Sequence, residues 1–154
     1  MFDVKAICDG RITLACVSNP FSMVEASAAL DRIRSGEIAG ADMASPVLVD
    51  VRTVRLAQLP TAEFVTYFRR RARGGIARTG NLMVCLCDDS GSFGMLRMFG
   101  IMADLEGVRP EDNYFVTENL EEAALWLTQR AGFDDAVRAD VIAETEAIRS
   151  SLPA

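Results

Sequence analysis

The chain has 154 residues, and with 50% of them hydrophobic it can bury the core of one domain. Its net charge of −6 argues against a nucleic-acid-binding surface, and the lack of any histidine excludes Ser-His-Asp and Cys-His catalysis within the chain. Because its apolar runs are far shorter than the roughly 20 residues that cross a bilayer, we expect a cytoplasmic protein with no membrane span.

Hydrophobic periodicity predicts an alternation of strands and helices after an opening hairpin. The hairpin is expected to turn at Asp9-Gly10, and a capping box of Ser22 and Glu25 begins the first helix. This order implies an α/β fold, with a mainly parallel sheet of about five strands, one antiparallel edge and helices packed on it. The expected elements are strands at 3–8 and 11–18, a helix at 22–36, a strand at 47–52, a helix at 60–73, a strand at 82–87, a helix at 92–106, a strand at 114–117, and helices at 118–131 and 133–152.

The helix expected at 60–73 is predicted to be amphipathic, with arginines on its outer side. Its inner side is expected to hold Phe64, Val65, Phe68 and Ala72. The arginines either form a solvated last turn, where cations oppose the negative end of the helix dipole, or bind an anion or acidic partner. We favour the solvated helix end. The arginines in question are Arg69, Arg70, Arg71, Arg73 and Arg78.

The four cysteines fall in segments predicted to be strands, where thiols are commonly small buried hydrophobes. Cys85 and Cys87 are separated by one residue and share a strand face, unlike the two-residue spacer of a redox pair or a zinc knuckle. We expect both thiols to be reduced, free of metal and covered by helices. No metal site and no cofactor is expected.

Residues 133–152 carry an apolar residue at every third or fourth position, which predicts an amphipathic helix. The chain therefore divides into a domain at 1–131 and a C-terminal helix at 132–154. The apolar stripe of this helix is expected to pack either on the domain or on a second subunit. We favour a second subunit in a homodimer.

Three stretches carry a resemblance to a known family: VLVDVRTVRL with Asp50 and Arg52, GMLRMFGIMADLEG with Arg97, and YFVTENLEEAALWL. They resemble the central strand, the third helix, and the closing strand and helix of the SpoIIAA-like branch of the STAS fold, which occurs in anti-sigma-factor antagonists and transporter tails. The resemblance covers residues 2–127 and implies a non-catalytic regulatory module that binds another protein.

Sporulation-type STAS members have a phosphorylatable serine in the turn after the central strand. Here the matching segment, AQLPTAEF, offers only Thr61. Thr61 is either a phosphorylation site or part of the helix start, where Thr beside Pro60 with Glu63 in the first turn is ordinary chemistry. We favour the helix start and expect no phosphorylation switch.

In open α/β sheets, ligands bind beyond the carboxyl ends of the strands, so residues there are candidates for binding a ligand or partner. The segment 90–94 either presents backbone N–H groups to an anion or is a capped turn, and we favour the turn. Arg97 is expected either to be structural, with its stem packed among apolar neighbours, or to bridge to Asp50 or Asp88. The candidates are Asp50, Arg52, Arg55, Thr61, Asp88, Ser90, Ser92 and Arg97.

We therefore expect a non-catalytic STAS-like module that binds a protein partner of unknown identity. The alternative is a carrier or sensor that binds a small apolar or amphipathic molecule between sheet and helices, since seven Met and eight Phe provide adaptable apolar walls. An enzyme ranks third, because no acid, base or thiol has a visible activating partner.

Overall fold

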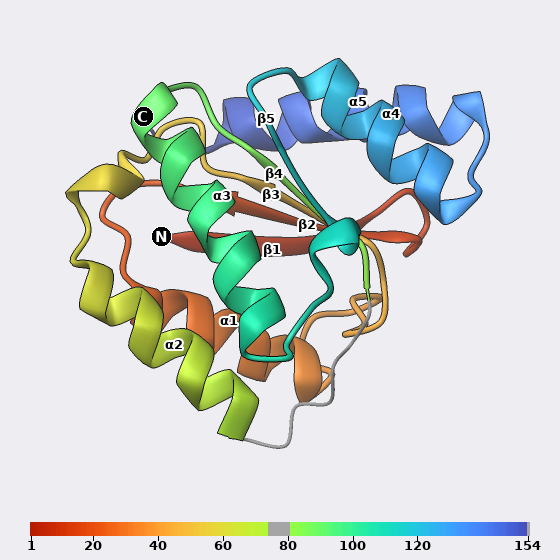
Figure 1. Ribbon diagram of the computed structural model, residues 1–154. Coiled ribbons are helices and arrows are strands. Elements are labelled where there is room, and N and C mark those ends of the chain that lie inside the picture. The colour runs from red at the N-terminus through yellow and green to blue at the C-terminus, as the bar shows by residue number, and fades with distance from the viewer. Residues whose placement is uncertain (74–80, 154) are drawn as a thin grey trace.

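The computed structural model describes residues 1–73 and 81–153, and these form a five-stranded sheet with helices on both faces (Figure 1). The strands follow one another across the sheet in chain order, with the first pair antiparallel and each later pair parallel. The structure confirms the predicted α/β fold, with a hairpin at one edge of a mainly parallel sheet. The strands are β1 (Phe2–Ile7), β2 (Ile12–Val17), β3 (Val47–Asp50), β4 (Met83–Leu86) and β5 (Tyr114–Thr117).

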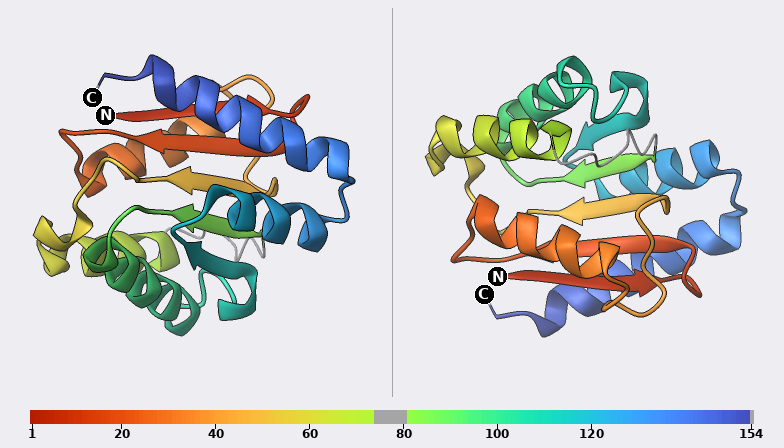
Figure 2. Two further views of the ribbon diagram at one scale, coloured as in Figure 1. Left: turned by 90° about the horizontal axis from the view of Figure 1, so that it is seen from above. Right: turned by 90° about the horizontal axis from the view of Figure 1, so that it is seen from below.

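Of the described α-helices, three cover one face of the sheet and two cover the other (Figures 1 and 2). Within the same ranges, no helix is both long enough and apolar enough to cross a bilayer. The first layer consists of α1 (Met23–Arg34), α2 (Thr61–Arg73) and α3 (Ser90–Leu105), and the second of α4 (Leu120–Ala131) and α5 (Asp135–Ser151). Single 3-10 turns, η1 (Leu56–Gln58) and η2 (Glu111–Asn113), precede α2 and β5.

The hairpin between β1 and β2 turns at Asp9-Gly10, as the sequence predicts, and Ile7 and Ile12 are the last paired residues on either side. Cys8 and Asp9 have positive φ angles of 51° and 56°, and the Gly10 N–H donates to the Ile7 carbonyl at 3.1 Å. Gly10 is left-handed too, with a φ of 80°, so three consecutive left-handed residues reverse the chain within the loop of residues 8–11. Cys8 therefore belongs to the turn and not to β1.

The sheet separates two hydrophobic cores, because successive side chains of a strand point to opposite faces. In β3, Val49 faces the layer of α1, α2 and α3, whereas Leu48 faces α4 and α5. Phe64 and Phe99 fill the first core with ring centroids 4.1 Å apart, and Leu127 is fully buried in the second. The two layers are thus packed independently of each other on one sheet.

The four cysteines are free and buried, two in each core. Cys85 and Cys87 lie beneath α1, α2 and α3, and Cys8 and Cys16 lie beneath α4 and α5. Burial raises the pKa of Cys85 and of Cys87 to about 11. Since thiolates are the reactive form, these thiols are inert at neutral pH while the cores stay closed.

The apolar stripe of the C-terminal helix is buried within its own chain. Val137, Val141 and Thr145 face the sheet and α4, and all three are buried. Asp134 caps α5 by accepting a hydrogen bond from the Val137 N–H at 3.0 Å. The apolar stripe for which we expected a second subunit is covered by the chain's own sheet and α4. It therefore provides no reason to expect a homodimer.

Candidate functional site

The carboxyl ends of the strands hold a buried carboxylate, Asp50, which is fully shielded from solvent at the end of β3. Arg52 donates to it through Nη2 at 2.9 Å and Nε at 3.1 Å, and Arg149 donates through Nε at 3.0 Å. Burial alone would raise the pKa of Asp50, but these hydrogen bonds outweigh it and hold the pKa below its ordinary value. Both arginines are therefore engaged by the chain's own carboxylate.

Arg149 ties α5 to the sheet at this point. Its Nη2 donates to the Asp50 carbonyl at 2.6 Å, and its Nη1 donates to the Val17 carbonyl at 2.9 Å and to the Thr53 hydroxyl at 3.1 Å. No local pattern points to this contact, because Arg149 is 99 residues from Asp50 along the chain. The predicted pair of Asp50 and Arg52 is thus one part of a brace that holds the C-terminal helix.

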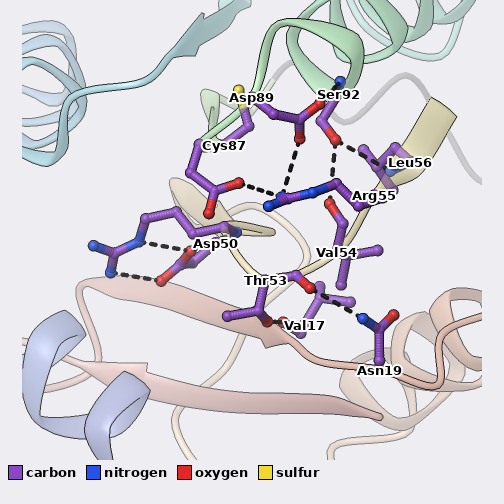
Figure 3. A network of polar contacts seen from close by, with 12 residues as sticks. Val17, Asn19, Asp50, Thr53, Val54, Arg55, Leu56, Cys87, Asp89 and Ser92 are labelled. Carbon is purple, nitrogen blue, oxygen red and sulfur yellow. Dashed lines mark hydrogen bonds and ion pairs between the residues drawn. The ribbon is translucent and has the colours of Figure 1, made fainter. Parts of the chain in front are cut away.

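Ser92 and Arg55 hold the loop after β3 against the start of α3 (Figure 3). The Ser92 hydroxyl, which is fully buried, donates to the Val54 carbonyl at 3.1 Å and accepts from the Leu56 N–H at 3.1 Å. Arg55 donates to Asp88 at 2.6 Å across the same gap. These side chains satisfy one another and connect neighbouring loops.

The start of α3 is a capped turn, as we favoured from the sequence. Asp89 is the N-cap residue and accepts a hydrogen bond from the Ser92 N–H at 2.9 Å. Hydrogen bonds with Ser92 lower the pKa of Asp89, and the positive charge of Arg55 adds to this. The donors that an anion would need are thereby occupied.

The remaining candidates lie apart from this network. Ser90 and Thr61 are exposed as the first residues of α3 and α2. Arg97 is exposed on α3, and the carboxylates it was expected to reach are paired with other arginines. The expectation that Arg97 bridges to Asp50 or Asp88 is therefore wrong.

A cavity of about 150 Å3 lies on the opposite face of the sheet, beneath α1, α2 and α3. Its walls are almost entirely apolar, and residues from every strand contribute to its floor. Polar residues gather near the amino end of β4, where Asn81 precedes the strand, Arg109 donates to Asn81, and the charge of Arg71 acts on Arg109. Its apolar walls include Phe2, Val4, Ala15, Val17, Phe21, Met23, Ala26, Ala29, Val49, Val51, Leu56, Phe64, Phe68, Leu96, Phe99 and Ala103.

Two buried arginines line the polar end of this cavity, Arg71 from α2 and Arg109 from the loop after α3. Their exposed fractions are 6% and 3%. Among the residues that the structure describes, no ion pair joins either guanidinium to a carboxylate. Residues 74–80 contain no Asp or Glu in their sequence.

Arg109 is held in place by the residues that precede β4. Its Nε donates to the Asn81 carbonyl at 3.1 Å, and its Nη2 donates to the Asn81 side-chain oxygen at 2.9 Å. Burial and, to a smaller extent, the nearby positive charge of Arg71 together lower the pKa of Arg109 to about 10. The group is still a cation at neutral pH, in surroundings that disfavour the charge.

Arg71 is the residue that sequence reasoning placed on the wrong side of α2. The helix buries Phe64, Phe68 and Arg71, and it exposes Ala72. Positions separated by four and then three residues share one helix face, so the spacing alone places Arg71 among the apolar residues. We had assigned it to the solvated helix end because of its charge, whereas only its neighbours in the arginine run lie there. Arg78 lies outside the described residues.

The Arg71 side chain is incompletely paired. Its Nε has no hydrogen-bond partner and is buried. Burial raises the pKa of the neighbouring Tyr67 phenol, and the charge of Arg71 and its hydrogen bond with Tyr67 offset only part of that rise. A buried donor of this kind marks a position where a hydrogen-bond acceptor is missing from the described chain.

Tyr114 lines the cavity, and Gly100 of α3 lies against its ring. The Tyr114 hydroxyl donates to the Leu96 carbonyl of α3 at 2.8 Å, which lays its ring flat against the helix. A Cβ atom on Gly100 would lie 2.4 Å from Cδ1 of that ring. Glycine at this position therefore permits the close approach of α3 to β5.

No group of three or more His, Cys, Asp and Glu side chains within residues 1–73 and 81–153 is arranged to hold a metal ion. Comparison of the chain with models of protein families, with curated proteins and with solved structures gives no match. The geometry of the cavity must therefore support any functional proposal.

Proposed function

We propose that this protein is a carrier or sensor that binds a small, largely apolar molecule in the cavity between the sheet and α1, α2 and α3. The observation that carries the proposal is the cavity itself, with its volume of about 150 Å3 and its apolar walls. Protein interiors are close-packed and contain few voids larger than a water molecule. A well-packed chain that keeps such a space beneath three helices is suited to holding a ligand there.

The size of the cavity limits the size of the ligand. An apolar cavity of roughly 150 Å3 accommodates one benzene molecule. A single aromatic ring or a chain of about six carbons therefore fits, whereas a long-chain lipid does not fit without movement of the helices. The two layers pack separately on the sheet, so α1 and α2 can adjust to a ligand while α4 and α5 remain in place.

A cavity-filling variant tests the proposal. Ala26 on α1 lines the cavity, and Ala26→Phe places a ring in it. Hexan-1-ol titrated into the full chain is expected to shift the NMR methyl signals of Met23 and Met43, which both line the cavity, and Ala26→Phe is expected to abolish the shift.

Ala28→Phe provides the matched control, since Ala28 is exposed on the same helix. It is expected to bind hexan-1-ol as the unchanged chain does. Equal binding by all three proteins would place the ligand outside the cavity and contradict the proposal. The protein-interaction module, the homodimer and the cytoplasmic location remain predictions from the sequence.

A further inference from the structure

We propose that the ligand is a small monocarboxylate with an apolar body, and that Arg71 and Arg109 bind its carboxylate. This inference rests on the proposed function, because it places the ligand in the same cavity. It adds the chemical class of the ligand and the end of the cavity at which the head group lies.

The described residues leave the positive charge at the polar end of the cavity unbalanced. Two guanidinium groups are more than nine-tenths buried there, and the described residues offer neither of them a carboxylate. Asp42 also lines the cavity, but it is exposed and its carboxylate accepts from the Ala44 N–H at 2.7 Å. Buried charges are normally paired, so two unpaired cations favour an anion between them.

The Arg71 guanidinium has a free donor at this end of the cavity. The Nε of Arg71 is buried without a partner, and it belongs to a planar fork that matches the two oxygens of a carboxylate. Arg109 is fixed by Asn81, so it can add charge without having to be ordered by the ligand. A pre-organised second cation of this kind reduces the entropy that binding costs.

The remaining walls of the cavity are almost entirely apolar. Beyond the arginines the cavity is bounded by Phe64, Phe99, Val49 and Leu96, among others, and these groups offer an apolar ligand body close contact and no hydrogen bonds. A ligand with one charged end and one apolar end therefore satisfies both parts of the cavity. A cation or a molecule that is polar throughout does not.

Three probes share a six-carbon chain and differ in the charge of the head group, so their affinities show how much the head group contributes to binding. The probes are hexanoate, hexan-1-ol and hexylamine. Calorimetric titration into the unmodified full chain is expected to show that hexanoate binds at least about tenfold more tightly than hexan-1-ol. A hydrogen bond between a guanidinium and a carboxylate contributes about that much to the affinity. Hexylamine is expected to bind more weakly than either, because its ammonium would face two guanidinium groups.

Variants then assign the head-group site. Arg71→Met keeps an unbranched side chain and removes the charge, and it is expected to weaken hexanoate about tenfold or more while leaving hexan-1-ol unchanged. Arg71→Lys should retain part of the preference for hexanoate. The matched control is Arg69→Met, since Arg69 is exposed on the same helix and its loss should change neither probe.

The outcomes separate the two proposals. If hexan-1-ol binds in the cavity as tightly as hexanoate, and Arg71→Met changes neither, the carboxylate inference is wrong and the proposed function stands. If no probe binds the unmodified chain, the proposed function is wrong and the inference fails with it. If Arg71→Met does not fold, the comparison of the three probes on the unmodified chain and on Arg71→Lys decides the question.

Discussion

Two pairs of arginines, one partly buried and one fully buried, lie at opposite ends of one sheet, and they differ in what neutralises them. At the carboxyl ends, Arg52 and Arg149 share the buried carboxylate of Asp50. At the amino ends and on the opposite face, Arg71 and Arg109 line a cavity with no carboxylate partner among the described residues. The first pair completes the fold, whereas the second pair lacks an anion.

The difference shows why charged residues near strand ends were a poor guide to the binding site. The general preference for the carboxyl ends of parallel strands led us to Asp50, where every charge is already engaged within the chain. A buried cation is a stronger indication of a site when its counter-ion is missing than when it is present. The following predictions test whether the two pairs really differ in this way.

The largest effect is expected from Asp50→Asn. The substitution removes the charge of the buried carboxylate that Arg52 and Arg149 share, while Arg52 keeps its ion pair with Glu146, and losing one partner of a buried pair costs up to about 3–5 kcal/mol of unfolding free energy. Urea denaturation followed by circular dichroism measures this. Asp88→Asn, at an exposed ion pair of the same sheet edge, should change stability little, and equal losses in both variants would contradict the prediction.

Acid should weaken the same brace. Because the pKa of Asp50 is lower in the folded chain than its ordinary value, its contribution to stability is complete above the unfolded pKa of about 4 and is lost as the pH falls through the folded value. Urea denaturation from pH 7 to pH 2 should therefore bring the unmodified chain and Asp50→Asn together in stability. A constant difference between them over this range would show that the carboxylate is not the source.

A smaller loss is expected from Gly100→Ala at the wall of the cavity. The new Cβ would lie 2.4 Å from the Tyr114 ring, so α3 and β5 must separate, and such overpacking costs about 1–3 kcal/mol. Gly94→Ala is the control on the same helix, because nothing lies within 4 Å of the position, and it should raise stability by about 0.5–1 kcal/mol. Thermal unfolding measures both variants. An equal rise in both melting temperatures would contradict the prediction, because it would show that the Tyr114 ring accommodates the added methyl group.

The smallest effect is expected from Arg71→Met measured without added ligand. Removing a buried cation that has no carboxylate partner should leave the unfolding free energy within about 1 kcal/mol, or raise it. Arg149→Met should be clearly more harmful, because it strips Asp50 of one of its two cations. Equal destabilisation of the two variants in urea would contradict the prediction that Arg149 is neutralised within the chain and Arg71 is not.

Local patterns were sufficient for the architecture. Strand and helix periods, the capping box at Ser22 and a mainly parallel sheet with one antiparallel edge follow from spacing along the chain, and the structure has all three. Contacts between distant segments were not accessible in the same way, which is why Arg149 went unnoticed. Arg71 was accessible from its helical spacing, but we ranked its charge above its position. Arg109 carried no local signal, since a single arginine before a proline is common in loops.

The division of the thiols between the cores gives the molecule two internal reporters. Cys85 and Cys87 become reachable by an alkylating reagent only when α1, α2 or α3 lifts from the sheet, and Cys8 and Cys16 only when α4 or α5 does. The sheet between them acts as a partition. Labelling rates would therefore distinguish transient opening of one layer from transient opening of the other.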